Sequence, residues 1–202
     1  MVKRNGKPAI AQDFGVHPRN WGGSPSFLAI DPGDVHVGLA EFRRIDGVWY
    51  CIWAGEKTPG EFLPWFVEGI RMSRWVQVVV ESWKLFPQAA PIYVGSDMPT
   101  SRLIGAIKAI VAFCSPDTGW FDEAPRMVLQ DPQIKVPTRG VLKRRKLRSV
   151  AKILGVPADH ASDAELHGYK FLIDQKEPIN NTNQQDAYWS DTRDLTPRHS
   201  IW

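Results

Sequence analysis

An apolar run that ends on a single acid, at residues 26–33, limits the folds open to this chain. Its residues are Ser-Phe-Leu-Ala-Ile-Asp-Pro-Gly, so a Pro-Gly pair ends the run directly after Asp31. A short apolar run with such limits predicts a buried strand over 27–31 in the centre of a sheet. An acid is costly to bury unless it is paired or binds a metal ion, so Asp31 is a candidate functional residue. The alternative is that Asp31 only forms a turn before Pro-Gly.

The residues that follow predict two antiparallel strands and then a helix. Alternating apolar residues predict strands over 36–45 and 48–54, with Asp46-Gly47 as the hairpin turn between them. The residues Thr-Pro-Gly-Glu at 58–61 are typical of a helix start with a capping box. Apolar spacing extends this helix to about residue 75.

A β-branched run at 76–81 predicts the next strand, which ends on a second acid, Glu81. A strand–helix–strand crossover is right-handed and makes its two strands parallel. If the strands over 27–31 and 76–81 are neighbours, Asp31 and Glu81 therefore emerge side by side at one edge of the sheet.

The second half of the chain is predicted to be mainly helical. We expect an apolar helix over 100–114, a short strand over 126–130, an irregular segment over 131–137, a helical stripe over 147–154 and a last helix from about residue 159. In the last helix, His160 and Asp163 are three residues apart and share one face.

Composition places the chain among globular proteins. It has 202 residues and a formal net charge of +3, so net charge alone excludes little. Cys51 and Cys114 are far apart in apolar runs, which predicts reduced core residues. No run approaches the length of a membrane span and residues 1–10 lack the apolar segment of a signal peptide, so we expect a cytoplasmic protein. Residues 1–25 are expected to form a flexible basic arm, 26–175 the folded domain and 176–202 a polar flexible tail.

Asp31, Glu81, His160 and Asp163 together predict a metal site. Clustered carboxylates repel one another, so a stable cluster usually needs cations. Carboxylate oxygens suit Mg²⁺ or Mn²⁺, and an imidazole shifts the preference toward Mn²⁺. Two such ions about 3.5–4 Å apart hold the attacking water and the leaving oxygen of a phosphodiester. All four residues are therefore candidate metal ligands and catalytic residues, with two ions per active site.

The same residues carry a family resemblance. The motifs Ile-Asp-Pro-Gly at 30–33, Val-Val-Val-Glu at 78–81 and His-Ala-Ser-Asp-Ala at 160–164 resemble, in this order, the RuvC-type Holliday junction resolvases of the ribonuclease-H-like superfamily. The resemblance implies an α/β fold with a mixed five-stranded sheet flanked by helices, and it makes residues 26–175 a nuclease domain. It also implies two divalent ions, a homodimer, paired nicks in four-way DNA and, for a short divergent member, a bacteriophage source. His160 stands where many members carry Asp, which leaves the metal preference open.

Basic and aromatic residues near these motifs are candidates for DNA binding. They are Trp83, Lys84, Phe86, Lys135, Arg139, Lys143, Arg144, Arg145 and Lys146. The aromatic residues either stack on bases at a junction or simply pack. The basic run neutralises phosphates or forms a solvated face, and Lys135, at a position that matches the family, contacts phosphate or is solvated. His167, one turn after Asp163, either supports a ligand or lies at the surface.

Parts of these motifs also occur in proteins of other functions. Actin-like kinases and ATPases have an Asp-Gly strand end, but they need two such domains and Thr or Ser donors, which residues 35–38 lack. A ribonuclease H or an RNA-processing nuclease of the same fold stays as the alternative enzyme. A non-catalytic branched-DNA-binding module would gain nothing from carboxylates that face phosphates.

The predicted helix over 100–114 bears on assembly. Its apolar residues cover most of the circumference and leave a narrow stripe at Arg102, Gly105 and Lys108. With one face on the sheet, the opposite face would expose Ile or Leu side chains unless a second subunit covers it. We therefore expect a homodimer built largely on this helix, with branched DNA as its partner.

Overall fold

Five strands form one mixed sheet in the order β3-β2-β1-β4-β5. The computed structural model describes residues 24–82, 98–113, 125–156, 159–181 and 184–185. The strands are β1 (Ser26–Asp31), β2 (Val37–Ile45), β3 (Val48–Lys57), β4 (Gln77–Glu81) and β5 (Arg126–Gln130). β1 pairs antiparallel with β2 and parallel with β4. This arrangement confirms the predicted mixed five-stranded sheet and the neighbouring, parallel positions of the two acid-ending strands.

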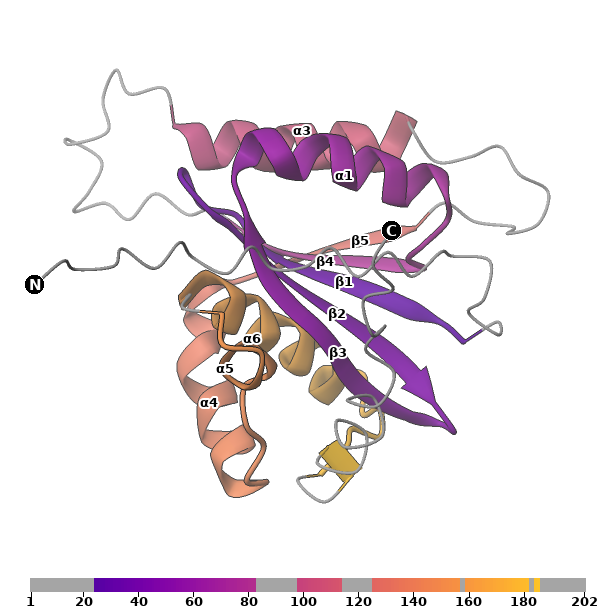
Figure 1. The fold of residues 1–202 in the computed structure, drawn as a ribbon, viewed down its shortest axis with the longest axis vertical. Coiled ribbons are helices and arrows are strands. Elements are labelled where there is room, and N and C mark those ends of the chain that lie inside the picture. Colours follow the sequence, from indigo (N-terminus) through magenta and orange to yellow (C-terminus); the bar gives the residue numbers. More distant parts are fainter. Residues whose placement is uncertain (1–23, 83–97, 114–124, 157–158, 182–183, 186–202) are drawn as a thin grey trace, which may run out of the picture.

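Helices cover both faces of the sheet (Figure 1). α1 (Pro59–Arg71) and α3 (Pro99–Phe113) lie on one face. The other face carries the 3-10 turn η2 (Pro132–Ile134), α4 (Lys135–Arg144), α5 (Val150–Ile153) and α6 (Asp159–Asp174). An apolar core fills the space on each side of the sheet, which confirms the predicted α/β architecture.

β1 is the central strand, and all six of its residues are buried. It has a strand on each side and a helical layer on each face, which explains its continuous apolar run. Successive side chains of a strand point to opposite faces. Phe27 and Ala29 pack in the core beneath α6, whereas Leu28 and Ile30 pack beneath α1 and α3. By this alternation Asp31 ends the strand on the α6 face.

The first hairpin and the first helix start where the sequence predicts. Asp46 and Gly47 have positive φ angles of 49° and 81°, as a type I′ hairpin turn requires. The Thr58 hydroxyl oxygen accepts a hydrogen bond from the Glu61 N–H, and the Glu61 carboxylate accepts one from the Thr58 N–H. This capping box starts α1, which ends at Arg71 rather than near residue 75.

Two glycines let α6 approach the sheet closely. A side chain at Gly168 would collide with an aromatic ring of β2, and a side chain at Gly38 would collide with the His160 carbonyl group. At the end of β3, the Glu56 carboxylate accepts a hydrogen bond of 3.3 Å from the Ala161 N–H. It thereby satisfies one of the free backbone donors in the first turn of α6. The start of α6, with His160, is therefore held against the end of the sheet.

The prediction of an irregular segment over 131–137 is wrong, because these residues contain η2 and the start of α4. The Asp131 side chain accepts a hydrogen bond from a backbone N–H two residues on, and Pro132 follows at the first position of the turn. Pro137 is tolerated because it lies in the first turn of α4, where its missing N–H would have no helical partner. Lys135 is consequently the first residue of a helix.

Part of the predicted flexible tail packs against β3. The Trp49 N–H donates to the Pro178 carbonyl at 2.9 Å, and the Asn180 N–H donates to the Trp49 carbonyl at 3.1 Å. Ile179 and Asn180 are buried, and Ile179 joins the core beneath α6. These described residues differ from the flexible tail expected from residue 176 onward, because their backbone pairs with an edge strand.

α3 buries its large apolar side chains within the chain. Leu103, Ile104, Ile107 and Val111 are buried, and none of the Leu or Ile side chains of α3 is exposed. Phe113 is the exception among the large residues, with 86% of its surface exposed. The predicted exposure of Ile and Leu side chains is therefore wrong, because the sheet and α1 together cover that side of the helix. The described part of the chain contains no helix with the length and apolar character needed to cross a membrane.

A buried carboxylate ties α6 to α5. Glu165 is 2% exposed and accepts hydrogen bonds from the Ser149 hydroxyl at 2.9 Å, the Val150 N–H at 3.0 Å and the Ala151 N–H at 2.6 Å. Burial raises the pKa of Glu165 to about 7, although the three hydrogen bonds act in the opposite direction. The carboxylate satisfies the free backbone donors at the start of α5.

We predict that Glu165→Gln lowers the free energy of unfolding by about 1–3 kcal/mol, because the amide NH₂ group would face a backbone N–H that loses its acceptor. Glu68→Gln, at an exposed position of α1, is the matched control. Urea denaturation at pH 8 measures both variants. A Glu165→Gln midpoint equal to those of the control and the wild type would contradict the prediction.

Candidate metal and catalytic site

The acids that end β1 and β4 lie side by side on the α6 face. The two strands pair parallel and in register through the residues that precede Asp31 and Glu81. Both acids stand two residues beyond a side chain that packs beneath α6, so both point to that face. The first turns of α6 contribute His160 and Asp163. Three elements thus bring the four predicted site residues together.

The Lys135 side chain lies at the centre of three carboxylates. Its Nζ is 3.0 Å from Asp31 Oδ1, 2.7 Å from Glu81 Oε2 and 2.9 Å from Asp163 Oδ2. The side chain is only 19% exposed, so water screens these ion pairs only in part. The solvated alternative for Lys135 is wrong, because α4 begins at this residue and directs it toward the carboxyl ends of the strands.

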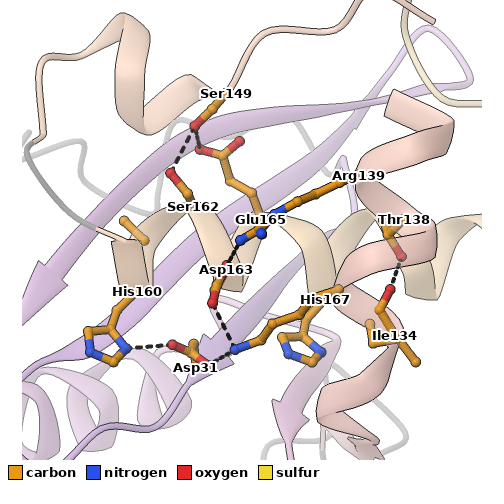
Figure 2. Close-up of polar contacts among 12 residues, drawn as sticks. Asp31, Ile134, Thr138, Arg139, Ser149, His160, Ser162, Asp163, Glu165 and His167 are labelled. Carbon is orange, nitrogen blue, oxygen red and sulfur yellow. Dashed lines mark hydrogen bonds and ion pairs between the residues drawn. The ribbon is translucent and has the colours of Figure 1, made fainter. Parts of the chain in front are cut away.

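His160 and Arg139 each pair with one carboxylate of the cluster (Figure 2). His160 Nδ1 is 2.7 Å from Asp31 Oδ2, and Arg139 Nη2 donates to Asp163 Oδ1 at 2.7 Å. Their side chains are 46% and 61% exposed, respectively. Arg139, a predicted DNA-binding residue, therefore lies between the carboxylates and solvent.

His167 belongs to the site, and the surface alternative for it is wrong. It is fully buried, and its Nε2 lies 2.9 Å from Glu81 Oε2. One ligand atom from each of Asp31, Glu81 and His167 can be chosen so that all lie within 4.8 Å of one another. Its position one helical turn after Asp163 is the only sequence signal that points to this place.

Asp31 and Glu81 differ in how readily they ionise. Burial, and then the adjacent Glu81 carboxyl group, raise the pKa of Asp31. Burial also favours the neutral form of Glu81, but hydrogen bonds from His167 and Lys135 hold its pKa below the ordinary value. Desolvation opposes the charge of Lys135, but the surrounding carboxylates raise its pKa. Of the two carboxyl groups, Asp31 therefore has the higher pKa, and the surroundings favour the charged forms of Glu81 and Lys135.

The cluster has the chemistry of a divalent-cation site. Carboxylates from three elements converge on one point, and the ammonium group of Lys135 shows that this point stabilises positive charge. Hard carboxylate oxygens are the ligands that Mg²⁺ and Mn²⁺ prefer. Asp31, Glu81 and Asp163 therefore fit a divalent ion, and His160 could add an imidazole ligand beside Asp31.

An exposed basic surface continues along α4 from the cluster. It comprises Lys143, Arg144, Arg145 and Lys146 at the far end of the helix. α4 packs against α6, so one end of α4 places Lys135 in the cluster while the other presents the basic run to solvent. The other predicted DNA-binding residues, Trp83, Lys84 and Phe86, lie outside the described residues.

We predict that Lys135→Met destabilises the protein in EDTA and that Mg²⁺ restores the stability. Without the ammonium group the three carboxylates repel one another. The expected loss is on the order of 2 kcal/mol, which is less than for a fully buried ion pair because the site is partly exposed. Melting temperatures in EDTA and in excess Mg²⁺ measure the effect.

Lys143→Met is the matched control for this experiment, since Lys143 is exposed on the same helix. The variant at 135 should show a larger Mg²⁺-induced rise in melting temperature than the wild type and the control. An equal rise in all three proteins would contradict the role given to Lys135.

No protein-family model matches the chain, and no curated protein matches it. Among solved structures, it is similar to the fowlpox virus resolvase in complex with Holliday junction DNA, with a TM-score of 0.50 and 11% identity over 74% of this chain and 98% of that chain. It is also similar to Thermus thermophilus RuvC, with a TM-score of 0.49 and 16% identity over 75% of this chain and 97% of that chain. The chain thus shares the fold of the fowlpox virus resolvase, in agreement with the mixed five-stranded sheet that the resemblance implies.

Proposed function

We propose that this protein is a divalent-metal-dependent endodeoxyribonuclease that resolves four-way or otherwise branched DNA by paired nicks. The observation that carries the proposal is the convergence of Asp31, Glu81 and Asp163 at one edge of a sheet whose fold is shared with a viral resolvase. One protein of similar fold is a resolvase in complex with Holliday junction DNA, which supports branched DNA as the substrate class.

In this proposal Asp31, Glu81, Asp163 and His160 hold two Mg²⁺ or Mn²⁺ ions. Such ions, when bound, activate a water molecule and stabilise the leaving oxygen of a phosphodiester. Hydrogen bonds from His167 and Lys135 hold the pKa of Glu81 below its ordinary value, which favours the ionised form that binds a metal ion. Arg139, exposed beside Asp163, is placed to bind a phosphate oxygen at the rim of the site. Lys135 adds positive charge within the site for the same phosphate.

Asp31→Asn is predicted to abolish nicking of a synthetic four-way junction while junction binding stays intact or becomes tighter. The change removes a ligand and a negative charge near the DNA phosphates. Asp34→Asn, at an exposed position three residues later, makes the same chemical change and should stay active. Cleavage is measured on gels with Mg²⁺ or Mn²⁺, and binding by fluorescence anisotropy. Full nicking by Asp31→Asn would remove Asp31 from the site.

The same assay separates the alternative functions when RNA–DNA hybrids are included. A ribonuclease H or an RNA-processing nuclease of this fold would cleave the hybrid or an RNA in preference to the junction. A non-catalytic branched-DNA-binding module would bind the junction and nick nothing. We expect the junction to be nicked in preference to the hybrid, and EDTA to stop the reaction.

We further propose that the basic run at the end of α4 binds DNA phosphates. Changing Arg144, Arg145 and Lys146 to Ala should weaken binding and flatten its salt dependence, by about 0.9 in slope for each phosphate that the variant no longer neutralises. Changing Arg71, Lys152 and Lys176 to Ala is the control, because it removes the same charge from exposed positions outside both the basic run and α3. Equal slopes for the two triple variants would assign the basic run to a solvated face.

We propose a homodimer, because paired nicks on a two-fold symmetric junction need two active sites. The candidate surface is the exposed side of α3, which ends at Phe113. Analytical ultracentrifugation at micromolar concentration should show a dimer with and without junction DNA. A monomer in both samples would contradict the dimer and the coordinated double nick.

The remaining proposals concern organisation and location. We propose that residues 26–175 form the nuclease domain, to which the described residues of 176–185 add a short extension along β3. Residues 1–25 are proposed to be a basic arm. The proposed site of action is the cytoplasm, that of the host cell if the protein is phage-encoded.

A further inference from the structure

A buried chain of hydrogen bonds stands behind Glu81, on the side away from solvent. His167 Nε2 lies 2.9 Å from Glu81 Oε2, and His167 Nδ1 lies 3.0 Å from the Gln130 amide. His167 is fully buried and Gln130 is 9% exposed. The last residues of β4 and β5, Glu81 and Gln130, are direct partners in the parallel register, so the sheet itself sets their spacing. Neither His167 nor Gln130 is needed to hold the metal ions in the proposal above.

The neighbours of Gln130 determine how its amide is oriented. In one orientation the amide nitrogen donates to the His167 carbonyl oxygen at 3.1 Å and to His167 Nδ1 at 3.0 Å, while the amide oxygen accepts from the Phe171 N–H at 3.3 Å. In the opposite orientation the amide oxygen would face the carbonyl oxygen, and the amide nitrogen would face another donor. Only the first orientation satisfies the buried polar groups.

This orientation determines which nitrogen of His167 carries the proton. Nδ1 accepts a hydrogen bond from the Gln130 amide, so in the neutral imidazole the proton is on Nε2. The Nε2–H then donates to Glu81 Oε2. Nε2 therefore has no free lone pair to offer a metal ion, even though it lies close to the carboxylates. His167 acts on the site through Glu81.

We propose that Gln130 and His167 form a buried positioning pair that holds the Glu81 carboxylate in one orientation for metal binding. This inference rests on the proposed function, because it takes Glu81 to be a metal ligand. Groups that hold a ligand in this way typically change metal affinity or activity by about 10–100-fold when they are removed. His167 and Gln130 are positioning residues here, since neither reaches the substrate side of the cluster.

The tautomer of His167 is tested directly in the wild-type protein without DNA. Nitrogen-15 NMR of labelled histidine distinguishes a protonated ring nitrogen from an unprotonated one. We expect His167 to show a protonated Nε2 and an unprotonated Nδ1, both before and after Mg²⁺ is added. A proton on Nδ1, or loss of the Nε2 proton when Mg²⁺ is added, would overturn the inference, and the second result would make His167 a direct ligand.

A matched pair of variants tests the consequence. In His167→Gln the side-chain amide nitrogen can reach the position of Nε2 and donate to Glu81, whereas the shorter side chain of His167→Asn reaches only the position of Nδ1. Calorimetric titration with Mn²⁺ should give a dissociation constant near wild type for His167→Gln and one raised about 10–100-fold for His167→Asn. Circular dichroism confirms that both variants are folded, and Mn²⁺ affinities at the wild-type value in both would overturn the inference.

The results of these measurements can contradict the positioning pair without contradicting the proposed function, and the reverse is also possible. Both are made without DNA, so a protein that binds Mn²⁺ as expected but nicks no junction would refute the nuclease proposal and leave the positioning pair in place. Conversely, junction nicking by a protein with the other His167 tautomer would refute the positioning pair alone.

Discussion

The site depends on the ion pairs that one ammonium group makes with three converging carboxylates. Asp31, Glu81 and Asp163 come from segments far apart in the chain, and each is costly to bury without an opposite charge. Lys135 supplies that charge at 2.7 to 3.0 Å from each carboxylate. One ammonium group leaves an excess of negative charge, which is the environment that a divalent cation prefers. The same charges therefore bear on the stability of the fold at this edge and on the proposed binding of metal.

The surrounding structure brings these charges to one point. The parallel pairing of β1 and β4 places two acids on the same face, and Gly38 allows the start of α6 to come close enough to add the third. The capped turn before α4 directs the Lys135 side chain into the space between the three carboxylates. Behind the cluster, the Glu165 carboxylate of α6 accepts hydrogen bonds from the start of α5, which holds these two helices together. A change in any of these supports would move one charge relative to the others.

The sequence predicted the acids at the strand ends well, but it predicted poorly the residues that hold these acids in place. Both results have physical reasons. Asp31 and Glu81 follow apolar runs with clear ends, and the handedness of the crossover is enough to pair them. The position of Lys135 among the carboxylates could not be predicted. Two prolines near it suggested an irregular segment, whereas the chain forms a capped turn followed by a helix there. The only sequence signal for His167 is its position one turn after Asp163, and Gln130 carries none, since a polar residue at a strand end or on a helix is usually at the surface. Their contact depends on the register between β4 and β5, which only the folded chain reveals.

The central claim is that the carboxylate cluster binds divalent cations at the place that the Lys135 ammonium group now occupies. A crystal structure of the protein grown with Mn²⁺, with anomalous diffraction recorded, tests this claim most directly. We predict that the anomalous map shows manganese ions within bonding distance of the carboxylates of Asp31, Glu81 and Asp163. Lys135 should then no longer pair with all three carboxylates. The absence of manganese from these carboxylates, with the three ion pairs of Lys135 unchanged in the same crystals, would contradict the claim.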